Sequence, residues 1–120
     1  MSFRGHAALF DRVDRAGDVF RAGAFAGAAG VPLLWQHRGG AVGELTAVRE
    51  DGRGLFIEGV VAEPEAARPV RSGALPGLSV GYRPVRARQG AWRELLEVEL
   101  VEVSLVAVPM QPGARVEIVG

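Results

Sequence analysis

The sequence predicts a mainly β protein with one or two short helices, folded as a small β-barrel or sandwich of about seven strands. Three observations support this fold class. Short apolar runs show the period-two alternation of strands, and turns rich in glycine and proline separate these runs. The 120 residues are enough for one compact domain rather than two. We therefore expect a single domain over residues 1–120.

The expected elements follow one another with little room for long loops. In chain order they are a strand at 3–10, a helix at 22–29, a strand at 31–37, a hairpin of 41–48 and 55–61, a helix at 63–72, and strands at 78–82, 92–96, 98–108 and 114–119. The turn-rich stretch 11–18 separates the first strand from the first helix. That helix is small and alanine-rich and ends at Gly30, which is a typical glycine stop.

The strand at 31–37 is expected to end where Arg38-Gly39-Gly40 breaks it. Four of its residues share one face at period two, namely Val31, Leu33, Trp35 and His37. The Asp51-Gly52 pair predicts the tight reversal of the following hairpin. Pro69 is expected to end or kink the second helix, because proline cannot donate the helical hydrogen bond.

The composition excludes several function classes. There is no cysteine, and the only histidines are His6 and His37, so neither thiol catalysis nor a histidine-rich zinc site is expected. The 14 basic residues, all arginine, balance 14 acidic residues without forming a block, which gives no support for nucleic-acid binding. No apolar leader or bilayer-length run is present, so we expect a soluble, intracellular protein without membrane contact.

Ser79 and His37 are the candidate nucleophile and base. Of four serines, Ser79 alone lies in a strand between two glycines, Gly77 and Gly81, which would let a peptide substrate approach closely. His37 ends an apolar strand beside a glycine-rich break, where one side of its ring can pack while the other stays open. An ordinary strand serine and a half-exposed structural histidine are the alternatives, and the residues alone leave them open.

Four segments, in series, resemble the prohead proteases of tailed bacteriophages, which are similar in fold to the herpesvirus assemblins. The segments are an opening with Gly5-His6-Ala7, Phe10-Asp11, Asp14, Gly17-Asp18 and Gly23-Ala24-Phe25, a histidine motif at 31–37, a serine motif at 73–82, and a closing strand and turn at 100–106, Pro109 and 112–114. They cover most of residues 5–114. The resemblance implies the assemblin-like β-barrel and a serine endopeptidase that needs no cofactor.

The resemblance also implies roles, substrates and a setting. His37 would be the base, Ser79 the nucleophile, and an acidic residue of the closing motif would orient the histidine. The substrates would be scaffold protein and major capsid protein, with self-cleavage left open, inside the assembling procapsid in the host cytoplasm. Pro69 and Pro76 depart from the family pattern. The chain ends soon after the last motif, so we expect a separate scaffold or a capsid-protein fusion to deliver it.

Alternation selects Glu102 as the orienting acid. Leu96, Val98 and Leu100 define one face of their strand, and Glu102 continues it, whereas Glu97 and Glu99 point the other way. A carboxylate inside a β core needs a partner, which an imidazolium supplies. The alternative is a solvated glutamate on an edge strand.

Two further assignments stay open at this stage. Arg83, four residues beyond Ser79, is a candidate for stabilising an oxyanion, because its alternation phase matches that of Ser79, and a solvated strand arginine is the alternative. The rival function is a non-catalytic capsid-assembly or scaffold-binding β-domain that keeps the fold without the activity. Homo-oligomerisation is left open as well.

Overall fold

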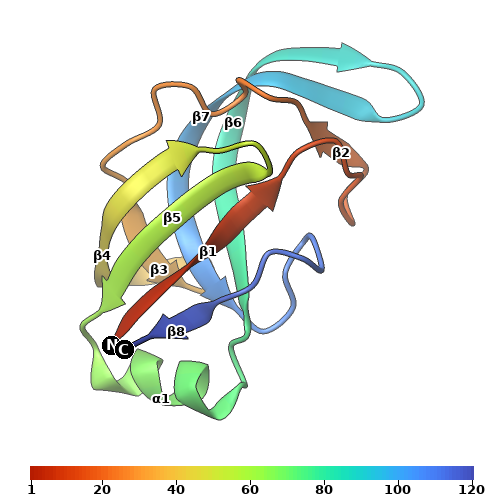
Figure 1. Ribbon diagram of the computed structural model, residues 1–120. Helices are drawn as coiled ribbons and strands as arrows, with labels where there is room; N and C mark the ends of the chain where they lie inside the picture. The colour runs from red at the N-terminus through yellow and green to blue at the C-terminus, as the bar shows by residue number, and fades with distance from the viewer.

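The computed structural model describes residues 1–120 and is mainly β with one short helix, which confirms the expected fold class (Figure 1). The elements are β1 (Ser2–Leu9), β2 (Asp18–Phe20), β3 (Pro32–Trp35), β4 (Arg38–Glu50), β5 (Gly54–Val61), α1 (Pro64–Ser72), β6 (Gly77–Gln89), β7 (Arg93–Val106) and β8 (Glu117–Val119). The hairpin predicted around Asp51 is present as β4 and β5.

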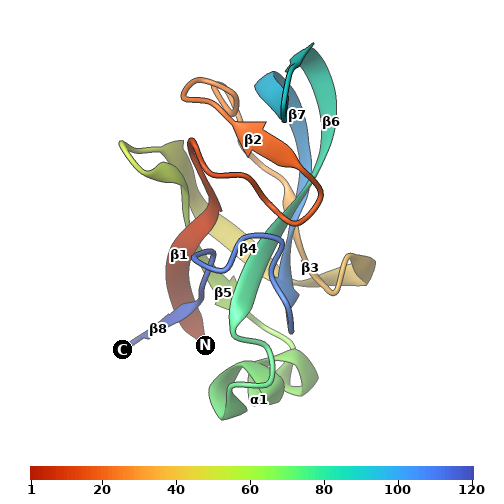
Figure 2. The same ribbon diagram turned by 90° about the vertical axis from the view of Figure 1, so that its right-hand side faces the viewer.

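All eight strands belong to one curved sheet (Figure 2). Its order is β2-β7-β3-β4-β5-β1-β8, and β6 pairs with β7 along almost its whole length. The sheet is not closed into a full barrel. The start of β6 meets the segment before β8 through an isolated bridge between Gly77 and Arg115, and Leu78 N–H donates to Ala114 O at 2.8 Å. Beyond Leu78, the outer edge of β6 pairs with no other strand.

The helix α1 lies at one end of the sheet and packs against the core. Ala66, Ala67 and Val70 are buried and join the apolar cluster inside the sheet. Gly73 ends the helix in the left-handed conformation at φ 86°. The helix does not end at Pro69, because it continues to Ser72. This helix lacks the length and apolar character needed to span a membrane.

The prediction of a helix at 22–29 is wrong. This segment is a series of tight turns, in which Gly23 and Gly27 adopt φ values of 92° and 81° and interrupt any helix. The carboxylate of Glu50 accepts hydrogen bonds from the main-chain N–H groups of Gly23 and Phe25 at 2.9 and 2.8 Å. A distant side chain therefore satisfies groups that a helix would satisfy locally.

The strand expected at 31–37 is shorter, and Arg38-Gly39-Gly40 does not break the chain. The strand β3 ends at Trp35, and β4 begins at Arg38 after a two-residue turn. The pairing of β3 with β4 is irregular between Leu33 and Trp35, and Leu33 is fully buried whereas Trp35 is 37% exposed. The four residues expected on one face therefore do not share it.

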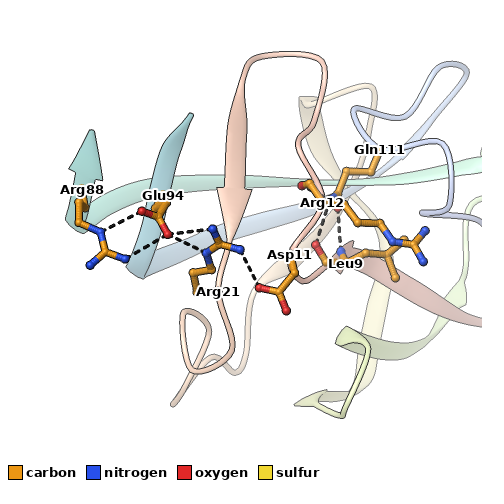
Figure 3. Close-up of polar contacts among 7 residues, drawn as sticks. All are labelled: Leu9, Asp11, Arg12, Arg21, Arg88, Glu94 and Gln111. Carbon is orange, nitrogen blue, oxygen red and sulfur yellow. Dashed lines mark hydrogen bonds and ion pairs between the residues drawn. The ribbon is translucent and has the colours of Figure 1, made fainter. Parts of the chain in front are cut away.

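β6 and β7 extend well beyond the segments predicted for them, and β7 is one continuous strand. Residues 83–93 at the far end of this hairpin are exposed, and charged pairs across the strands support it. Glu94 receives hydrogen bonds from Arg88 and from Arg21 of the neighbouring chain segment, as Figure 3 shows. These two guanidinium groups lower the pKa of Glu94 to about 2.

The short strand β2 was not predicted, and it is tied to the sheet by a buried carboxylate. Asp18 is only 3% exposed and accepts two hydrogen bonds from Arg93 of β7, at 2.7 and 2.9 Å. The hydroxyl of Tyr82 on β6 donates to the same carboxylate at 2.6 Å. The Arg93 hydrogen bond lowers the pKa of Asp18, while burial raises that of Tyr82. One side chain thus connects β2, β6 and β7.

Asp18→Asn is expected to lower the free energy of unfolding by about 1–3 kcal/mol at neutral pH, because charged hydrogen bonds to Arg93 are lost. The folded pKa of Asp18 lies below its ordinary value of 3.8. The stabilisation is therefore complete above that value and is lost as the pH falls through the lower folded pKa. Urea unfolding of the wild type and the variant from pH 7 to pH 2 measures their difference in the free energy of unfolding. This difference should become smaller only in the acid range. A constant difference would contradict the assignment.

Candidate active site

A cavity of about 90 Å³ opens beside the first half of β6. Ser79 and His37 both line it, although 42 residues separate them in the chain. The walls are mostly apolar and include Ala7, Phe20, Leu78, Tyr82 and Met110. The cavity is several times larger than the roughly 10–15 Å³ that one water molecule needs. It therefore has room for a side chain next to both polar groups.

His37 lies in the two-residue turn between β3 and β4 rather than at a strand end. Gln36 and His37 have φ values of 53° and 62°, and Trp35 and Arg38 pair on either side of them. Both positive φ values are typical of a type I′ turn, which normally uses asparagine and glycine. Left-handed φ costs other residues about 1–2 kcal/mol each. Contacts with the rest of the protein must therefore hold this turn.

Those contacts come from β7 and the residue that follows it. Gln36 N–H donates to the main-chain oxygen of Leu105 at 3.0 Å, which continues the β3–β7 ladder by one residue. The side-chain oxygen of Gln36 accepts a hydrogen bond from Ala107 N–H at 3.0 Å. His37 N–H donates to the hydroxyl of Ser104 at 3.0 Å. The turn is thus attached to β7 at three points.

The imidazole of His37 is paired with Glu102. The distance from His37 Nδ1 to Glu102 Oε2 is 2.6 Å, and Glu102 is 8% exposed. An ionised carboxylate only accepts hydrogen bonds, so the proton of this pair is on Nδ1. Nε2 is then the unprotonated nitrogen of the neutral ring, and it can accept a proton from a neighbouring group.

Ser79 lies on β6 and faces the cavity. It is 6% exposed, and its hydroxyl has no hydrogen-bond partner within the chain. Every side-chain polar atom that is fully buried does have a partner. Solvent must therefore reach the Ser79 hydroxyl, and the cavity supplies that access. The structure brings Ser79 to the same cavity as His37, and it joins His37 to Glu102 directly.

The glycines beside Ser79 make room for the chain's own residues. Gly81 is directly opposite Glu102 in the β6–β7 ladder, and a Cβ atom on it would overlap the Glu102 carboxylate. A Cβ atom on Gly77 would lie 2.7 Å from the ring of Pro109. A residue without a Cβ atom at position 81 therefore leaves the space that the Glu102 carboxylate occupies.

The other sequence candidates lie outside the site. Glu97 and Glu99 are exposed, and Arg83 forms an ion pair with Glu99 at 3.0 Å with its side chain 75% exposed. A register shift between Gly81 and Tyr82 changes the alternation, so Arg83 does not follow the phase of Ser79. His6 pairs with Asp51 at 2.7 Å, away from the cavity. No three His, Asp or Glu side chains are grouped as metal ligands would be.

Two residues of the site were not singled out from the sequence. Ser104 is fully buried and forms hydrogen bonds with both His37 and Glu102. The signal was available, because Ser104 follows Glu102 by two residues and so shares its face of the strand.

Gln111, which lines the cavity, fastens the loop after β7 to the end of β1 (Figure 3). Its amide accepts a hydrogen bond from Leu9 N–H at 2.7 Å and donates one to Leu9 O at 3.0 Å. A glutamine that imitates a strand partner leaves no pattern in the sequence.

Comparison with known proteins gives one family and one fold. A family model described as Caudovirus prohead serine protease matches residues 1–120. The varicella-zoster virus protease is similar in structure, with a TM-score of 0.60 and 20% identity over 97% of this chain and 62% of its own. The KSHV protease, solved in complex with a hexapeptide phosphonate inhibitor, gives a TM-score of 0.61 and 14% identity over 96% of this chain and 63% of its own.

At these identities the two structures share a fold with this chain. The expected assemblin-like fold is therefore confirmed. This chain spans less than two thirds of the length of either protease. No curated protein matches the sequence.

Gly81→Ala is expected to displace the Glu102 carboxylate and to weaken its hydrogen bond with His37, because the added methyl group would occupy the same space. Overpacking of this kind lowers the free energy of unfolding by about 1–3 kcal/mol. Thermal unfolding and the ¹H NMR signal of the His37 ring proton measure the two effects. Gly40→Ala is the matched control, because Gly40 is also in a strand but has open space where its Cβ would lie. Equal, small effects from both variants would contradict the prediction.

Proposed function

The chain belongs to the caudovirus prohead serine protease family, and from this premise we propose that it is itself an active serine endopeptidase. In this proposal Ser79 is the nucleophile, His37 the general base and Glu102 the residue that orients His37. The observation that carries the proposal is the 2.6 Å hydrogen bond between His37 Nδ1 and Glu102, made by a histidine that lines one cavity with Ser79. No cofactor takes part.

Glu102 keeps His37 in the tautomer that the reaction needs. With the proton on Nδ1, only Nε2 can take the proton of the Ser79 hydroxyl. The buried carboxylate also stabilises the imidazolium that forms when His37 accepts this proton. The three side chains thus have the roles of nucleophile, base and orienting acid that acyl transfer requires.

The reaction then proceeds in two steps. Ser79 Oγ attacks the carbonyl carbon of the scissile peptide bond as its proton moves to His37 Nε2, and this proton passes to the leaving amine as the C–N bond breaks. An acyl-enzyme remains on Ser79. Water, deprotonated by the same histidine, hydrolyses the ester and restores the serine.

The open edge of β6 is the proposed binding site for an extended substrate. Leu78 N–H points away from β7, since it donates to Ala114 O. Alternation gives the main chain of Val80 the same direction, and no strand pairs with β6 there. A peptide added at this edge would run past Ser79, and one of its side chains would enter the apolar cavity.

The substrates proposed for this chain are the scaffold and major capsid proteins of the assembling procapsid. The prohead setting of the family supports this choice. Cleavage would take place inside the procapsid, and self-cleavage is part of the proposal. A capsid-assembly domain without activity is the competing function, and the Ser79 experiment separates the two.

Ser79→Ala is expected to abolish reaction with a fluorophosphonate probe and cleavage of the cognate capsid protein. In the wild type, Ser79 Oγ forms a bond to phosphorus, fluoride leaves, and His37 takes the serine proton. Intact mass and peptide mapping measure the labelling. The control is Ser72→Ala, which removes an exposed serine and should be labelled at the wild-type rate. A wild-type chain that is neither labelled nor able to cleave capsid protein would favour the non-catalytic function.

Glu102→Gln is expected to reduce the labelling rate by roughly two to four orders of magnitude with the fold intact, because an amide no longer fixes the tautomer of His37. The matched control is Glu99→Gln, three residues earlier on β7, where the carboxylate is exposed and paired only with Arg83. That variant should keep the wild-type rate. The labelling rates of the two variants are compared by quenching the reaction at several times and measuring the labelled fraction. Similar rates for the two variants would exclude Glu102 as the orienting residue.

A further inference from the structure

Ser104 forms two hydrogen bonds that connect the proposed base with its orienting acid. Its hydroxyl accepts a hydrogen bond from His37 N–H at 3.0 Å and lies 2.8 Å from Glu102 Oε1. A main-chain N–H can only donate, and a carboxylate can only accept. The single hydroxyl proton of Ser104 is therefore directed at Glu102, while its lone pair holds His37.

The position of Ser104 in the sheet makes this link rigid. Ser104 is fully buried, and it faces Ser79 across the β6–β7 ladder and Leu34 across the β3–β7 ladder. Its main chain therefore lies between two neighbouring strands, β3 and β6. Because Glu102 precedes it by two residues, both side chains project from the same face of β7.

We infer that Ser104 is a positioning residue, which holds the main chain of His37 and the carboxylate of Glu102 in the arrangement that activates Ser79. The inference rests on the proposed function. Glu102 Oε2 binds the ring of His37, and Ser104 occupies the remaining oxygen, Oε1, so the carboxylate cannot rotate. The same hydroxyl secures the turn of His37, where φ is 62° without a glycine. Removing it frees both partners of the 2.6 Å hydrogen bond at once.

Ser104→Ala tests this inference through the proton between His37 and Glu102. A proton in such a short, charge-assisted hydrogen bond gives a ¹H NMR signal far downfield of ordinary amides. His6 is the only other histidine, so a His6→Gln variant assigns the signal. The signal of His37 should be lost or broadened by exchange in Ser104→Ala. An unchanged signal overturns the inference, whether or not the chain proves to be a protease.

The second measurement is the fluorophosphonate reaction. The maximal labelling rate should fall by about 10- to 100-fold, while the probe concentration for half-maximal rate should change by less than about threefold. Ile57→Val is the control for a merely structural effect, since Ile57 is fully buried on β5 and does not line the cavity. That variant should lower the melting temperature without changing the rate. Equal rate losses in both variants would overturn the inference.

A third variant covers failure of Ser104→Ala to fold. Ser104→Cys keeps a side chain of similar shape with a much weaker donor and acceptor. In this variant the His37 ¹H NMR signal and the maximal labelling rate should both decrease, but by less than in Ser104→Ala. A folded Ser104→Cys protein with the wild-type signal and rate overturns the inference. Absence of labelling in the wild type itself, with the NMR result as expected, would count against the proposed function and not against the role of Ser104.

Discussion

The turn that carries His37 depends on contacts with a strand about 70 residues further along the chain. Gln36 and His37 both adopt left-handed φ, although neither is a glycine or an asparagine. Their combined conformational cost is about 2–4 kcal/mol, which hydrogen bonds to Leu105, Ala107 and Ser104 offset. Such strain persists only where the surrounding structure determines the conformation, and it is most common at functional sites. The β3–β4 hairpin and the candidate site are therefore stabilised by the same contacts.

β7 is central to this arrangement because both of its edges are used. One edge pairs with β2 and β3, and the other pairs with β6. Glu102 lies on β7 and is 8% exposed, and an unpaired carboxylate there would be strongly destabilising. His37 and Ser104 supply its partners, and Gly81 supplies the space. The buried charge is tolerated because two hydrogen bonds satisfy the carboxylate and a glycine leaves space for it.

Local signals in the sequence predict much of the fold, but long-range contacts decide where the predictions fail. The Asp51-Gly52 reversal and the helix before Gly73 need only neighbouring residues, and both are present. The segment at 22–29 forms turns instead of a helix because Gly23 and Gly27 adopt left-handed φ, and Glu50, a distant residue, binds the main chain in this form. Alternation correctly predicts that Glu102 faces inward, and Glu102 is buried. The turn of His37 was missed because its stability comes from β7, which no local pattern reveals.

The register between β6 and β7 places four residues of the site opposite one another in two pairs. Ser79 faces Ser104 and Gly81 faces Glu102, so a Ser-x-Gly segment lies against a Glu-x-Ser segment read in the opposite direction. A slip of β6 by one residue would turn Ser79 to the other face and would place Val80 or Tyr82 opposite Glu102, where the space suits a glycine. The first irregularity of this ladder comes immediately after Gly81, so the bulge changes the phase of Arg83 without disturbing the two pairs. The geometry of the site is therefore a consequence of the pairing between β6 and β7.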